Sequence, residues 1–211
     1  MKKHITLAVA TALTIAFTLS AQASDKLRYD YIDFGYLHSA GERTSDKTGY
    51  QFNLSLAFDD TWYVRSTLQS QSADVWTADS KGDVTATEYS MAIGFHVPTS
   101  RTDDFFLEAG YLKFDGDGII PQSTYGNDED GFLVNTGFRG RLSTSWEYKV
   151  FAGYKDYDYS EYVNEALHED STSTTYGLEG RYYLSKNWSF GIKVSEEITG
   201  LTSGFDFRFN L

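Results

Sequence analysis

The stretch that decides the fold runs from residue 175 to residue 211 and reads TYGLEGRYYLSKNWSFGIKVSEEITGLTSGFDFRFNL. Large apolar side chains occupy every second position on both sides of the turn at 185–187 and again up to the last residue. These positions are Tyr176, Leu178, Tyr182, Leu184, Trp188, Phe190, Ile192, Val194, Phe205, Phe207, Phe209 and Leu211. Successive side chains of a strand point to opposite faces, so the pattern predicts three strands with one apolar, charge-free face and one polar face.

The same two-residue period recurs through the rest of the chain and predicts seven earlier strands. We expect them at about residues 28–38, 50–58, 62–69, 88–97, 105–112, 132–141 and 146–155. Short turns follow the even-numbered strands, whereas long polar loops, the largest at 70–86, 114–130 and 156–173, follow odd-numbered ones. The sequence therefore predicts an all-β fold, with ten antiparallel strands of about ten residues each in up-and-down order.

The N-terminus carries a predicted signal peptide. Lys2 and Lys3 precede an apolar run at 5–19, and Ala21-Gln22-Ala23 fits a small-x-small cleavage site, so we expect a signal peptide at 1–23 and one mature domain at 24–211. The alternative, a membrane-spanning helix, needs about 20 apolar residues. Loss of the two lysines changes the formal charge from −12 to −14, which argues against nucleic acid as a partner. The chain has no cysteine, so the fold must close by hydrogen bonding and packing.

A charge-free apolar face on every strand is what a lipid bilayer requires. Backbone groups in hydrocarbon need internal partners, and strands provide them only as a closed barrel. Roughly 9 to 11 residues carry a tilted strand across the bilayer, as predicted here. An aromatic girdle is expected at the short-turn side, formed by Trp62, Trp146 and Trp188. The alternative is a soluble barrel of lipocalin type, with the apolar face inside. Glycines in the polar phase, aromatic residues at strand ends and segregated short and long connections favour the lipid-facing interpretation.

Three short motifs carry a resemblance to a known group: YDYIDFGY at 29–36, FAGY at 151–154 and LSKNW at 184–188. With them the chain resembles the small outer-membrane β-barrel proteins of Gram-negative bacteria, of the outer membrane protein β-barrel domain type. The resemblance implies an integral barrel in the cell outer membrane, in contact with membrane lipids and lipopolysaccharide. It also implies that residues 205–211, from Phe205 to Leu211, act as a signal for the barrel-assembly machinery. Leu211 stands where the group usually has an aromatic residue.

The polar phase places many charges of both signs inside the expected barrel. The predicted lumen charge network consists of Asp33, Arg65, Glu88, Glu108, Arg139, Arg141, Glu147, Lys149, Glu179, Arg181, Lys193, Asp206 and Arg208. Buried charges must be paired, and small barrels are usually filled by side chains, which favours a salt-bridged, closed interior. A narrow, water-filled pore with a weak anion preference is the alternative.

No constellation of acid, base and nucleophile stands out, so we predict no catalytic residues, no cofactor and no metal. His38 and His168 are isolated candidates, which leaves an outer-membrane hydrolase as a distant third possibility. Acidic loops near Asp115 and Asp130 lack the spacing of a calcium loop. Aromatic residues expected to be exposed in the loops are Trp76, Tyr125, Tyr157, Tyr159 and Tyr162. We therefore expect a non-catalytic barrel with a structural or surface-interaction role through its acidic, Tyr-rich loops, or alternatively a narrow porin-like channel. The oligomeric state stays open.

Overall fold

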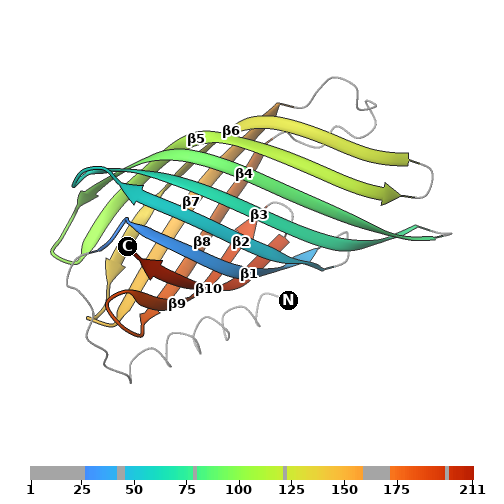
Figure 1. Cartoon of the computed structure of the whole chain (residues 1–211). Coiled ribbons are helices and arrows are strands. Elements are labelled where there is room, and N and C mark those ends of the chain that lie inside the picture. The colour runs from blue at the N-terminus through green and yellow to red at the C-terminus, as the bar shows by residue number, and fades with distance from the viewer. Residues whose placement is uncertain (1–26, 42–45, 78–79, 121–122, 159–171, 198–199) are drawn as a thin grey trace.

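A computed structural model describes residues 27–41, 46–77, 80–120, 123–158, 172–197 and 200–211 (Figure 1). The predicted signal peptide lies outside these residues. No helix in the described part of the chain is long and apolar enough to cross a membrane. The strands are β1 (Tyr31–Gly41), β2 (Lys47–Ala57), β3 (Trp62–Thr77), β4 (Ser80–Pro98), β5 (Asp103–Ile120), β6 (Ser123–Arg141), β7 (Trp146–Asp158), β8 (Thr172–Tyr183), β9 (Trp188–Glu197) and β10 (Gly200–Asn210).

These ten strands form one closed antiparallel barrel. Each strand pairs with its neighbours in the sequence, and β1 pairs with β10 to complete the ring. At this seam Phe34 lies opposite Phe207 on one side and Phe52 on the other. Closure gives every strand a hydrogen-bonding neighbour on both sides and removes the edges of the sheet. The predicted ten-stranded up-and-down barrel is confirmed.

Four turns of one length close the hairpins at one end of the barrel, at residues 58–61, 99–102, 142–145 and 184–187. In the first turn, the Asp59 carboxylate accepts hydrogen bonds from the backbone amides of Thr61 and Trp62, each at 2.7 Å. In the second, the Ser100 hydroxyl donates to the carboxylate of Asp103 at 2.5 Å. This hydrogen bond holds the pKa of Asp103, at the water-facing start of β5, below its usual range. Side-chain caps of this kind let each strand begin directly after its turn.

The opposite end differs from the prediction of long loops. The ladder between β3 and β4 continues to the pair Thr77–Ser80, and that between β5 and β6 continues to Ile120–Ser123. Residues expected in the loops 70–86 and 114–130 are therefore mostly strand, and the strands run from 10 to 19 residues. Beyond the lipid both faces meet water, so polar residues can extend a ladder without apolar alternation. The two hairpins project beyond the ends of β1 and β2 (Figure 1).

The distribution of side chains is inverted relative to a soluble protein. Apolar residues point outward, for example Met91 at 62 % exposure and Phe207 at 51 %, whereas the interior buries Glu108 and Arg181 at 1 % each. A soluble barrel would place these groups the other way round. Tyrosines gather on the outer face toward the long hairpins, at positions 50, 89, 111, 154 and 176. The outer face is therefore a lipid-facing band, and the soluble-barrel alternative is wrong.

Candidate functional site: the barrel lumen

The predicted network residues lie on inward-facing positions of β1 and β3 to β10, and the structure shows which of them meet. In the half of the lumen near the short turns, Glu147 is the central acceptor. Its carboxylate lies 2.6 Å from Arg139 Nε and accepts a hydrogen bond from the Tyr183 hydroxyl at 2.6 Å. Arg208 Nη1 lies 3.7 Å from the same carboxylate. The ion-paired side chains are at most 6 % exposed, so the cluster is dry.

Arg208 also ties β10 to β1 at the closing seam, and Arg181 ties β8 to β10. Arg208 on β10 donates to Asp33 on β1, with Nη2 to Oδ2 at 2.9 Å. Arg181 on β8 donates to Glu179 at 2.5 Å and to Asp206 on β10 at 2.6 Å. Because fully buried charges are destabilising without partners, these pairs favour the closed ring over any open form.

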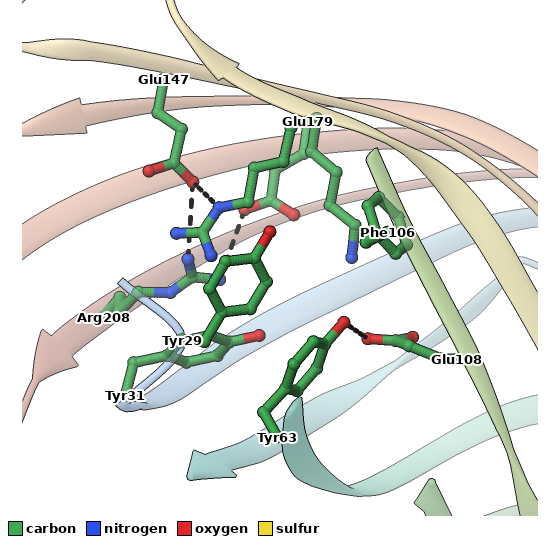
Figure 2. Close-up of a pocket in the computed structure, with 10 residues that line it drawn as sticks. Tyr29, Tyr31, Tyr63, Phe106, Glu108, Glu147, Glu179 and Arg208 are labelled. Carbon is green, nitrogen blue, oxygen red and sulfur yellow. Dashed lines mark hydrogen bonds and ion pairs between the residues drawn. The ribbon is translucent and has the colours of Figure 1, made fainter. Parts of the chain in front are cut away.

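Glu108 on β5 is the centre of a third group of contacts. Glu108 binds Arg65 Nη2 at 2.9 Å. It also accepts a hydrogen bond from the Tyr63 hydroxyl at 2.8 Å (Figure 2). Gly94 lies opposite Tyr63, whose ring occupies the space that a Cβ on Gly94 would need. Toward the long hairpins, Lys155 Nζ and Glu88 are 2.7 Å apart, with side chains 20 % and 13 % exposed. Space accessible to water therefore reaches this half of the lumen.

Tyr157 corrects one prediction. We expected its side chain among the exposed loop aromatics, but its hydroxyl donates to Glu88 inside the barrel at 3.0 Å. Its ring packs against the inward-facing apolar residues Ala92, Leu112 and Leu133. The cause is register: Tyr157 follows Lys155 by two positions, so both share the inner face. Tyr159, Tyr162 and His168 lie outside the described residues, as do the side chains of Trp76 and Tyr125.

Five cations of the network lie over aromatic rings, namely Arg139, Arg141, Lys149, Lys193 and Arg208. Arg141 lies over the Tyr183 ring at 4.5 Å and donates to the Thr144 carbonyl at 3.1 Å. Lys149 Nζ lies 4.6 Å from the Phe106 ring centroid, and Lys193 Nζ lies 5.5 Å from that of Phe151.

A short strap ahead of β1, residues 28–30, crosses the short-turn mouth of the barrel, and sequence reasoning did not find it. Arg139 Nη1 donates to the Arg28 carbonyl at 2.7 Å, although β6 and β1 lie on opposite sides of the ring. The Tyr29 hydroxyl donates to Asp104 at 3.2 Å, and its ring stacks on His96 at 3.9 Å. Tyr29 and Tyr31 lie between the Glu147 cluster and Tyr63 (Figure 2). Tyr29, Tyr31 and Asp33 share the inward-facing phase, which was the available signal for the strap. The charged Asp30 in the outward-facing phase obscured this pattern.

Free space in the lumen is unevenly distributed. A cavity of about 110 Å³ lies toward the long hairpins, lined by residues such as Gln51, Thr67, Lys149 and Lys193. Near the strap the remaining space is about 10 Å³, bounded by Tyr29 and its neighbours. A single water needs roughly this much room, so the short-turn end is nearly filled.

The predicted girdle residues lie at the short-turn end. Trp62 and Trp188 are 41 % and 53 % exposed on the outer face, and Trp146 packs against Tyr182 with ring centroids 5.0 Å apart. The described residues contain no group of three side chains that could hold a metal ion. His38 lies 3.8 Å from Asp46, and both side chains are largely exposed.

Comparison with known proteins gives similarity of fold. No protein-family model and no curated protein matches the chain. Among solved structures, the translocator domain of autotransporter NalP from Neisseria meningitidis has a TM-score of 0.53 and 11 % identity, covering 100 % of this chain and 96 % of its own. The NanC porin has a TM-score of 0.50 and 8 % identity, covering 85 % and 100 %. Ail, the attachment invasion locus protein of Yersinia pestis, has a TM-score of 0.44 and 11 % identity, covering 87 % and 100 %.

The chain has the fold of an outer-membrane β-barrel. The lipid-facing outer band, the charged interior and the closed ladder place it in the outer membrane as an integral protein.

Proposed function

We propose that this protein is a closed, non-catalytic outer-membrane barrel that acts through structure and surface contacts. The strap at residues 28–30 carries the proposal, because it fills the short-turn mouth with Tyr29 and fastens to the opposite wall through Arg139. Behind it, the cavity bounded by Tyr29 and Glu147 has a volume of about 10 Å³. Such packing supports a stable cylinder and opposes solute passage.

The surface role rests on the projecting hairpins. A strand rises about 3.3 Å per residue, so the 19 residues of β4 span roughly 60 Å along the strand. With a tilt of about 40°, this is roughly 45 Å along the membrane normal, against an apolar band of about 25 Å. A continuous ladder therefore carries the hairpin tips roughly 20 Å beyond the lipid. A rigid projection of this kind suits contact with lipopolysaccharide or with another surface.

The C-terminal strand offers a second interaction. Phe205, Phe207, Phe209 and Leu211 form an apolar row on the outer face of β10, which ends at the short-turn mouth. In the proposed role, the barrel-assembly machinery recognises this row before β10 pairs with β1.

Conductance in a planar bilayer tests the closed-barrel proposal. Purified, refolded protein is expected to give no discrete current steps, because the strap and the Glu147 cluster leave no water-filled path. Folding is established first by heat-modifiable mobility on a gel. Stable, reproducible steps from the wild-type protein would contradict the proposal.

A narrow channel is the second candidate, and the cavity of about 110 Å³ in the outer half of the lumen favours it. It would need the strap to leave its position. Current steps from the wild type that disappear when the strap is cross-linked to β6 would support it.

The surface role has a separate test in cells. Residues 73–84 are replaced by Asn-Gly, which joins Ser72 and Thr85 by a two-residue turn and keeps their pairing. If the hairpin acts at the surface, the shortened barrel still folds but does not restore detergent resistance to cells that lack the protein. Full restoration by the shortened barrel would restrict the role to the membrane-embedded part.

A further inference from the structure

The cavity in the long-hairpin half of the lumen contains a cation whose charge is not matched by a bonded carboxylate. Lys149 on β7 lines this cavity, and no carboxylate lies within ion-pair distance of its ammonium group in the described part of the chain. The two nearest acidic side chains have other partners. Glu108 is bound to Arg65 at 2.9 Å, and Glu179 is bound to Arg181 at 2.5 Å.

Within the described residues, the close contacts of the Lys149 ammonium are with two aromatic rings. It lies 4.6 Å from the centroid of Phe106 and 5.5 Å from that of Phe151. Such contacts contribute about 0.5 to 2 kcal/mol, which is less than the cost of taking a charge out of water. An anion in the cavity would complete the site.

A second polar group on the same wall also lacks a partner. Thr175 on β8 lines the cavity and is 7 % exposed, and its hydroxyl oxygen has no hydrogen-bond partner among the described residues. It lies opposite Gly153, four residues along β7 from Lys149. Buried hydroxyls are normally hydrogen-bonded, so this group is also available to a ligand.

The remaining lining limits what can bind. Phe151 and Leu133 offer apolar contact to an organic ligand rather than to an inorganic ion. Glu179 and Asp206 on the cavity wall would repel a second negative charge. The volume of about 110 Å³ is somewhat below the 150 Å³ of an engineered cavity that binds benzene, which suggests about six non-hydrogen atoms or fewer.

We propose that this cavity binds a small organic monocarboxylate, with the carboxylate on the Lys149 ammonium and a second polar group on the Thr175 hydroxyl. A short hydroxy acid has this chemistry. The site lies on the long-hairpin side of the strap, so its occupancy does not depend on whether the barrel conducts.

Titration of the whole refolded barrel with lactate, followed by amide chemical shifts in detergent micelles, tests the proposal. Ionic strength is held constant with chloride, and lactamide serves as the neutral isostere. We expect saturable shifts near Phe151 and Gly177 with lactate and none with lactamide. Replacing a charged hydrogen-bonding partner costs roughly tenfold or more in affinity, so Lys149→Met should weaken binding at least that much.

The variants separate the site from general electrostatics. Thr175→Val is expected to weaken lactate binding severalfold, and Lys186→Met, in an exposed short turn, should leave it unchanged. Each variant is first checked for folding by heat-modifiable gel mobility. If Lys149→Met does not fold, Thr175→Val and the lactate–lactamide difference in the wild type decide. Equal shifts from lactate and lactamide, or unchanged affinity in a folded Lys149→Met or Thr175→Val variant, would overturn the proposal.

Discussion

Replacing Glu147 by glutamine is expected to destabilise the folded barrel by about 3 kcal/mol. The wild-type carboxylate binds Arg139 and Tyr183, both at 2.6 Å, and lies 3.7 Å from Arg208. Removing one member of a buried ion pair costs about 3 to 5 kcal/mol, because the remaining charge is left without compensation. The lower end applies to Glu147→Gln, since the amide oxygen can still accept one hydrogen bond.

Urea-induced unfolding in phospholipid vesicles, followed by tryptophan fluorescence, measures this change. The double variant with Arg139→Met is expected to lose less stability than the two single changes added together, because neither charge is then left alone. Lys149→Met provides a contrast two residues away on the same strand. Its ammonium has no bonded carboxylate among the described residues, so its removal should leave the free energy of unfolding unchanged or raise it. A loss below about 0.5 kcal/mol for Glu147→Gln would refute the reasoning, since surface changes have effects of that size.

Other perturbations test the strap, the lipid face, the turns and the seam. Tyr29→Ala should open the short-turn mouth and produce current steps in planar bilayers that the wild type lacks; a silent variant would show that the Glu147 cluster alone closes the lumen. Ile93→Arg, on the outward face of β4 at 58 % exposure, should cost about 2 to 4 kcal/mol in vesicle unfolding, and a neutral result would contradict the lipid-facing assignment. The folded-state pKa of Asp103 is lowered, so its charged carboxylate stabilises the fold above the ordinary carboxyl pH range, and this contribution is lost as the pH falls through that range. Asp103→Asn should flatten that part of the stability–pH curve. An unchanged slope would count against the Ser100 hydrogen bond. Deleting residues 205–211 should abolish assembly, since β10 then cannot pair with β1, and heat-modifiable mobility from the truncated chain would disprove this.

Alternation separated the two faces of each strand. The glycines of the polar phase, the aromatic strand ends and the segregated connections then indicated which face meets lipid. Lipid tolerates no charge, so the outward phase of each strand is recognisable from Phe205 and Phe207 just as from Tyr50 and Phe52. The prediction of ten strands follows from the same constraint. Inward positions obey no such rule. The charged residues could therefore be assigned to the lumen, but their pairing could not be predicted.

The pairings depend on register and on how side chains cross the lumen. Asp33 and Arg208 meet because β1 and β10 pair at those positions. Closure of the barrel sets this pairing, and the local sequence pattern does not indicate it. The strap lies before the first residue of β1, and the charged Asp30 obscured the inward phase that Tyr29 shares with Tyr31 and Asp33. The extended hairpins were missed for a related reason. In water, polar residues such as Ser70 and Thr87 fit a ladder or a loop equally well. Here their hydroxyls lie 3.1 Å apart across the two strands.

The strap has a consequence for the order in which the molecule takes shape. Arg28 and Tyr29 contact one residue from each of five consecutive strands, namely Ser55, Tyr63, His96, Asp104 and Arg139. All of these lie in β2 to β6, the N-terminal part of the chain. A sheet of six strands fastened to the strap would already be bent into a half-cylinder. The strap at residues 28–30 could thus set the curvature of the first six strands, and the later strands would continue this curvature as they join.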